Sequence, residues 1–138
     1  MAGSYIVCPM EKRTDYYCVD YATLVGSLAK RWPGAQVRTR PEDYGQGGCA
    51  WSVTLGREEY GCVVRPPHHS LSIEPHRGEG VAVMAVWFRS LVPPEYRLGL
   101  FYPDAWPKWL DLTIETTEQD ALDFVEGRAP GSPRLDFM

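Results

Sequence analysis

Three histidines and four cysteines are the residues of this sequence that could bind a metal or act as nucleophiles. The histidines are His68, His69 and His76, and the cysteines stand at positions 8, 18, 49 and 62. A metal site needs at least two such ligands close together on one face. On a strand, His68 and His76 would lie about 26 Å apart at roughly 3.3 Å per residue, and only a sharp bend at Pro75 would unite them. We therefore expect surface histidines, no metal site and no cofactor.

Catalysis by a cysteine needs a thiolate, which forms where a histidine or a positive environment lowers the thiol pKa. Cys18 and Cys62 lie within apolar patterns, where burial raises a thiol pKa instead. No Cys-x-x-Cys pair is present. We expect reduced, mostly buried thiols, because free cysteine packs as a small hydrophobe; two disulfides are the alternative for four cysteines.

Other catalytic patterns are equally weak. The stretch Gly-Gln-Gly-Gly at 45–48 lacks the Lys-Ser/Thr ending of a phosphate-binding loop, and Cys49 begins a predicted strand instead of a helix. The carboxylate pairs Glu42-Asp43 and Glu58-Glu59 lie in predicted turns, where neighbouring side chains diverge into solvent. The sequence therefore predicts no catalytic residue.

The strongest remaining signal is a local concentration of acidic residues. Residues 104–126 hold seven acids and one base, a net charge of −6, whereas residues 1–103 hold ten acids and eleven bases. Large aromatic side chains within a polar rim are typical of binding hot spots, and a negative field steers a basic partner. The predicted partner-binding residues are Asp104, Trp106, Trp109, Asp111, Glu115, Glu118, Asp120 and Asp123. The alternative is structural, with the acids complementing a helix dipole and Trp109 in the core.

Composition excludes several classes of protein. The net charge of −4 argues against nucleic-acid binding, which needs a clustered basic face. The longest apolar run, residues 81–88, is far shorter than the roughly 20 residues of a membrane span. The N-terminal residues do not read as a secretory signal. We expect a cytoplasmic protein with a single domain over residues 1–127 and a loose tail over 128–138, in which Leu135 and Phe137 could dock.

Hydrophobic periodicity predicts the elements that position these residues. Helices are predicted from Asp20 to about Trp32, over 81–92, and after a cap at Thr116 or Thr117 with Gln119 or Asp120 three residues on. A buried strand is the alternative for 81–88. Strands are predicted over 4–8, 35–40, 49–55, 60–65, 70–74, 98–102 and 110–114, with a loop over 41–48. The predicted fold class is α+β, with an antiparallel sheet of about five to seven strands, three helices on one side and the order β-α-β-β-β-β-α-β-β-α.

Two resemblances accompany this pattern. The element order from Asp20 onward resembles the type III secretion chaperone-like fold, whose members are small acidic proteins that often dimerise. The runs Trp-Phe-Arg-Ser-Leu-Val-Pro at 87–93, Leu-Phe-Tyr at 100–102 and Leu-Thr-Ile-Glu-Thr-Thr-Glu-Gln-Asp at 112–120 are similar to small bacterial proteins linked to toxin immunity. These runs are mostly structural, and neither resemblance implies a catalytic residue.

Our leading hypothesis is a non-enzymatic protein-binding module, an immunity protein that covers the active site of a toxin, as a monomer or homodimer. A basic toxin domain would suit the acidic segment. The first alternative is a secretion-type chaperone that dimerises and binds an extended client segment. The second is an enzyme or small-molecule binder with a pocket lined by Trp51, Tyr60 and Trp87.

Overall fold

The computed structural model describes residues 3–12, 15–65, 70–74 and 78–128. Four α-helices, two short 3₁₀ helices and seven strands make up this part of the chain. In chain order they are β1 (Tyr5–Pro9), α1 (Tyr21–Arg31), β2 (Gln36–Val37), η1 (Pro41–Asp43), α2 (Tyr44–Gly47), β3 (Cys49–Leu55), β4 (Glu58–Arg65), β5 (Ser70–Glu74), α3 (Glu79–Ser90), β6 (Leu98–Phe101), η2 (Pro103–Ala105), β7 (Trp109–Leu112) and α4 (Glu118–Val125).

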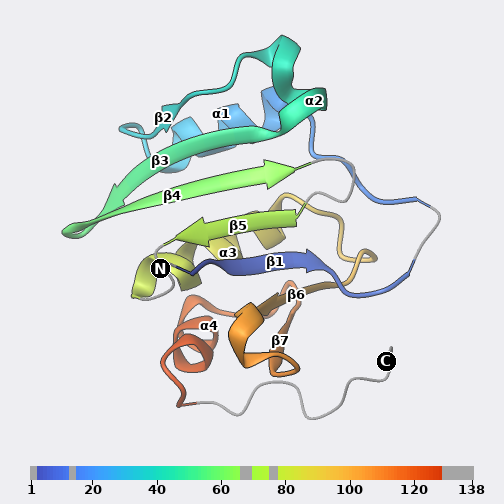
Figure 1. Cartoon of the computed structure of the whole chain (residues 1–138), viewed down its shortest axis with the longest axis vertical. Coiled ribbons are helices and arrows are strands. Elements are labelled where there is room, and N and C mark those ends of the chain that lie inside the picture. The colour runs from blue at the N-terminus through green and yellow to red at the C-terminus, as the bar shows by residue number, and fades with distance from the viewer. Residues whose placement is uncertain (1–2, 13–14, 66–69, 75–77, 129–138) are drawn as a thin grey trace.

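The strands form one antiparallel sheet with the order β2-β3-β4-β5-β1-β6-β7. Helices α1 and α3 lie behind this sheet in Figure 1, and α4 lies at its β6–β7 end. No α-helix of the described part of the chain covers the face toward the viewer, and we call it the open face. The predicted α+β class is confirmed.

Buried and partly exposed side chains alternate along the strands, which explains why the helices pack on one face of the sheet. Trp51, Cys62 and Ile73 are directly opposite one another across β3, β4 and β5, and all three are buried in the main core. Directly opposite residues share a face of the sheet, and neighbours along a strand point the other way. The intervening row, from Ala50 through Val63 to Ser72, is partly exposed and therefore lies on the open face.

Two predicted helix starts are confirmed in detail. The carboxylate of Asp20 accepts a 2.7 Å hydrogen bond from the backbone N–H of Thr23 and caps α1. Thr117 and Asp120 form a reciprocal capping box at the start of α4. Residues 81–88 belong to helix α3, and the strand alternative for them is wrong. Helix α3 is buried on most of its circumference because α4 packs on it from one side and the sheet from another.

Between α1 and β3 one prediction is wrong and another is confirmed with shorter bounds. The expected loop over 41–48 forms η1 and α2, since Pro41 begins the first turn and Tyr44 anchors the second by donating a 2.7 Å hydrogen bond to the carbonyl of Val19. The expected strand over 35–40 shortens to β2. Its ladder ends where the side chain of Thr39, in place of a backbone carbonyl, accepts the N–H of Ala50 at 2.9 Å.

The described helices are too short for a membrane span, and none meets the length and hydropathy that crossing a bilayer requires. Of the tail predicted over 128–138, only Arg128 is among the described residues. The expected docking of Leu135 and Phe137 therefore lies outside them.

Candidate protein-docking site

The β6–β7 hairpin places three of its side chains on the open face. Leu100 lies opposite Leu110, and this pair points toward the helices. The alternating positions therefore point away from the helices, and they include Phe101 opposite Trp109 and Asp111 opposite a glycine. Residues 104–112, which hold half of the predicted partner-binding set, thus lie at the free edge of the sheet.

Trp109 is buried beneath a small apolar cluster on the open face. Its side chain is 1% exposed and Met10, at 4%, packs in the same place. Gly99 leaves room for both, since a Cβ at this position would lie 2.7 Å from the Met10 sulfur and 2.9 Å from the Trp109 ring. The guanidinium of Arg97 lies 5.6 Å from the ring centroid of Trp109. Trp109 cannot contact a partner directly in this structure, so its predicted role is corrected to a support for its neighbours.

Gly99→Ala tests this packing. We expect a loss of about 1 kcal/mol in the free energy of unfolding, because the added methyl overpacks against Met10 and Trp109. Gly61→Ala on the same face is the matched control, since a Cβ there meets nothing within 4 Å, and it should be neutral or stabilising. Urea denaturation followed by tryptophan fluorescence measures both. Equal effects of the two substitutions would contradict the proposed close packing.

Trp106 is the exposed aromatic of the predicted set. Its side chain is 39% exposed, and its ring stands edge-on to Phe101 with 5.0 Å between centroids. Beside it lies a hollow of about 480 Å³, which we call the Trp106 hollow. Its lining consists of Cys8, Pro9, Met10, Glu11, Lys12, Arg97, Phe101 and Trp106. An apolar concavity with an exposed indole at its border is typical of a binding hot spot.

The N-terminal half of this hollow, residues 8–12, is absent from the set of residues predicted from the sequence. Residues 8–12 meet the β6–β7 hairpin only because β1 pairs with β6, with Ile6 opposite Phe101. Burial raises the pKa of the Cys8 thiol to about 11, and its sulfur lies 3.9 Å from that of Met10. Cys8 therefore stays protonated at neutral pH and lines the hollow as a hydrophobe instead of acting as a nucleophile.

The cysteines agree with expectation except at one position. All four are free. Burial also raises the pKa of Cys62, to about 12, and that of Cys49. Cys18 is exposed, contrary to its predicted place in an apolar pattern. It precedes the Asp20 cap, so it lies outside helix α1 and its apolar face.

The acidic residues divide between the sheet edge and helix α4. Asp111 lies 3.7 Å from Arg97, Glu118 lies 3.0 Å from Arg31, and Asp123 lies 2.9 Å from Arg128. Asp120 is held in the capping box of α4, and hydrogen bonds from Gln119 and Arg128 lower the pKa of Asp123. These four carboxylates therefore have structural partners, which weakens their field.

Asp104 and Glu115 differ from these four acids, because neither forms an ion pair or a helix cap among the described residues. Asp104 lies in η2, two residues before Trp106, and Glu115 lies between β7 and α4. Both are exposed. Of the predicted acids, they are the best placed to interact with a partner.

Ile114 is the second exposed large hydrophobic residue among those described. The strand predicted over 110–114 ends at Leu112 as β7, and Ile114 beyond it is 70% exposed. The chain leaves the sheet because Thr113 and Thr116 form a tight turn. Two threonines three residues apart, each able to hydrogen-bond the backbone, were the available signal.

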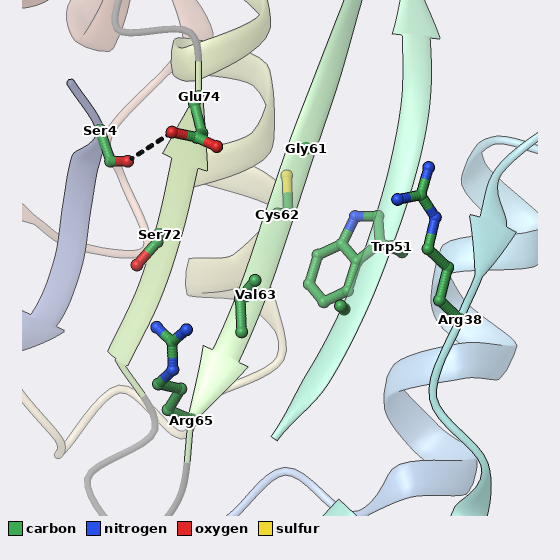
Figure 2. Close-up of a pocket in the computed structure, with 10 residues that line it drawn as sticks. Ser4, Arg38, Trp51, Gly61, Cys62, Val63, Arg65, Ser72 and Glu74 are labelled. Carbon is green, nitrogen blue, oxygen red and sulfur yellow. Dashed lines mark hydrogen bonds between the residues drawn. The ribbon is translucent and has the colours of Figure 1, made fainter. Parts of the chain in front are cut away.

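A separate shallow hollow of about 350 Å³ lies over the centre of the open face. Figure 2 shows Arg38, Arg65 and Glu74 around small residues that include Gly61 and Ser72. The charged groups lie on different sides and do not converge, and Glu74 accepts a 3.3 Å hydrogen bond from Ser4. Catalysis needs convergent groups at one point, so this hollow offers no arrangement for it.

The pocket around Trp51, Tyr60 and Trp87, on which the small-molecule alternative depends, is filled by core side chains. The rings of Trp51 and Trp87 pack edge to face with 5.9 Å between centroids, and Tyr60 packs against the start of α3. All three side chains are buried and fill the core.

The three histidines of the sequence, His68, His69 and His76, lie outside the described residues. Within the described ranges, no group of three potential ligands could hold a metal ion.

Comparisons with known proteins add no relative. Neither a protein-family model, nor a curated protein, nor a solved structure matches this chain.

Proposed function

We propose that this chain is a non-enzymatic protein-binding module that docks through the β7 edge of its sheet. The observation that carries the proposal is the exposed indole of Trp106, which packs edge-on against Phe101 beside an apolar hollow. Tryptophan is enriched at binding hot spots because it removes a large area from water at low cost in side-chain entropy.

The local charge indicates the kind of partner. Residues 104–126 carry a net charge of −6, and Asp104 and Glu115 lie on either side of β7 without an ion pair among the described residues. A basic protein surface would be attracted to this edge. The biological form that we propose is a cytoplasmic immunity protein of the bacterial type, which covers the active site of a basic toxin domain.

Trp106→Ala is the decisive variant. The candidate partner is the protein encoded beside this chain, and its affinity is measured by isothermal titration calorimetry. Loss of a hot-spot indole costs about 2 kcal/mol or more, which is roughly a 30-fold weaker Kd. Trp106→Phe keeps an aromatic ring against Phe101 and should retain most of the affinity.

Arg57→Ala, at the exposed turn between β3 and β4, controls for remote surface changes. It should bind as the parent chain does. Unchanged binding of Trp106→Ala to a partner that the parent chain binds would place the docking surface elsewhere. If the neighbouring protein does not bind the parent chain at all, the immunity assignment fails.

A further inference from the structure

A hydrogen-bonded turn over residues 113–116, which we call the Ile114 turn, holds an isoleucine out in solvent. The N–H of Thr113 donates to the hydroxyl of Thr116 at 2.9 Å, and the N–H of Glu115 donates to the hydroxyl of Thr113 at 3.1 Å. The N–H of Thr116 donates to the carbonyl of Thr113 at 3.1 Å, and its hydroxyl lies 3.4 Å from the carbonyl of Asp111. Local backbone donors and both threonine hydroxyls are therefore engaged.

The turn is also fixed at both ends. Strand β7 precedes it, and the capping box of α4 begins at Thr117 directly after it. A side chain on a preformed support loses little conformational freedom on binding, so more of its contact energy contributes to affinity. The β-branched Ile114 is itself stiff about its first torsion. The turn thus presents an apolar group that needs little ordering.

The position of Ile114 relates it to the Trp106 hollow. Among the described residues, Trp106 and Ile114 are the exposed large hydrophobic side chains. They stand before and after the same edge strand, β7. A single exposed aliphatic residue is ordinary on a protein surface, but here the two exposed residues flank one free edge. A partner that covers Trp106 and extends along the whole of β7 would also meet Ile114.

The negative charge of Glu115, beside the Ile114 turn, indicates which residues a partner would carry around its binding pocket. Glu115 follows Ile114 directly and has no ion-pair partner in the described ranges, while the carboxylate of Glu118 is already paired with Arg31 at 3.0 Å. A lysine or arginine of a partner can therefore pair with Glu115 without breaking an existing contact.

We infer that the Ile114 turn is a second, specificity-determining anchor, which inserts Ile114 into an apolar pocket of the partner protein whose rim carries lysine or arginine. This inference rests on the proposed function, and it adds the partner's surface chemistry to it. An apolar pocket binds the isoleucine by removing it from water, and Glu115 disfavours partners whose pocket rim is acidic.

The test uses the full chain and the partner that the parent chain binds in a Trp106-dependent way. Calorimetry compares Ile114→Ala, Ile114→Asp and Glu115→Lys with the parent chain, and Glu59→Lys, an exposed acid in β4, is the matched charge control. We expect Kd to rise about tenfold for Ile114→Ala and further for Ile114→Asp, because the carboxylate would have to enter the apolar interior of the pocket, beneath its basic rim. Glu115→Lys should weaken binding at least fivefold more than Glu59→Lys does.

The outcomes separate this inference from the proposed function. If Trp106→Ala abolishes binding while Ile114→Asp binds within twofold of the parent chain, the anchor role is wrong and the docking module stands. If Ile114→Ala weakens binding but Glu115→Lys equals Glu59→Lys, the basic rim is wrong. If no partner depends on Trp106, both proposals fall. Urea denaturation of each variant shows that its fold is intact, as expected for exposed positions.

Discussion

Gly80→Ala is expected to lower the free energy of unfolding by about 3 kcal/mol, at the upper end of the range for overpacking a core. Gly80 lies in the first turn of α3, and its N–H donates a 3.2 Å hydrogen bond to the hydroxyl of Tyr60. A Cβ at this position would overlap the Tyr60 ring. The ring is buried between β4 and the helix, so it cannot move aside without displacing core neighbours.

Gly26→Ala is the matched control for this prediction, because Gly26 is a helical glycine of α1 with nothing within 4 Å of its hypothetical Cβ. Alanine there should raise the free energy of unfolding by about 0.5–1 kcal/mol through helix propensity. Urea denaturation monitored by circular dichroism measures both variants. If Gly80→Ala were as stable as the parent chain, the close approach of α3 to β4 would be wrong.

Arg89→Met is expected to cost about 3 kcal/mol or more, although methionine fills a similar volume. The guanidinium is 3% exposed and serves backbone carbonyls. The terminal nitrogen Nη1 donates to the carbonyls of Tyr96 at 2.8 Å and Leu112 at 3.4 Å. The terminal nitrogen Nη2 donates to the carbonyls of Val92 at 2.6 Å and Pro93 at 2.7 Å. Methionine would leave these acceptors unsatisfied, and hydrogen bonds to a charged group are each worth about 1.5–3 kcal/mol.

Arg89→Lys separates charge from geometry in this prediction. Burial lowers the pKa of Arg89 while Asp111 raises it, and lysine keeps the charge but cannot reach four carbonyls with one ammonium. We expect most of the loss to persist. Arg57→Met, at an exposed turn, is the control and should change the free energy of unfolding by less than about 0.5 kcal/mol. Stability of Arg89→Met within that margin would contradict a structural role.

Local signals made much of the fold predictable from the sequence. The caps at Asp20 and Thr117 work within three or four residues, so the sequence contains all the information that they need. The alternation in residues 49–55 likewise predicts β3 with its observed bounds. The prediction of a loop over 41–48 was wrong because glycine and proline indicate a break in regular structure. Composition does not reveal that the hydroxyl of Tyr44 donates a hydrogen bond to the carbonyl of Val19, which anchors a helical turn there.

The candidate site was less predictable because its parts come from distant segments. The acidic segment and Trp106 are visible in one stretch of sequence, but the hollow beside Trp106 also needs Cys8 and Met10. Their arrival depends on the pairing of β1 with β6, which no local pattern specifies. Trp109 is buried and Ile114 is exposed. This difference depends on which face of the sheet the helices cover and on where β7 ends. Periodicity marks an alternation but does not say which side is inside.

The central position of β1 has a consequence for how the chain folds. Strands β2 to β5 form one continuous meander and β6 and β7 form a hairpin, and these two parts join only through β1, which lies between them (Figure 1). Tyr5 pairs with Ile73 and Ile6 with Phe101, so both edges of β1 are occupied only after the chain as far as Phe101 is available. Contacts between such remote segments slow folding. During translation this strand exposes both of its edges to whatever it meets, and the hairpin that carries Trp106 joins the sheet only when β1 is in place.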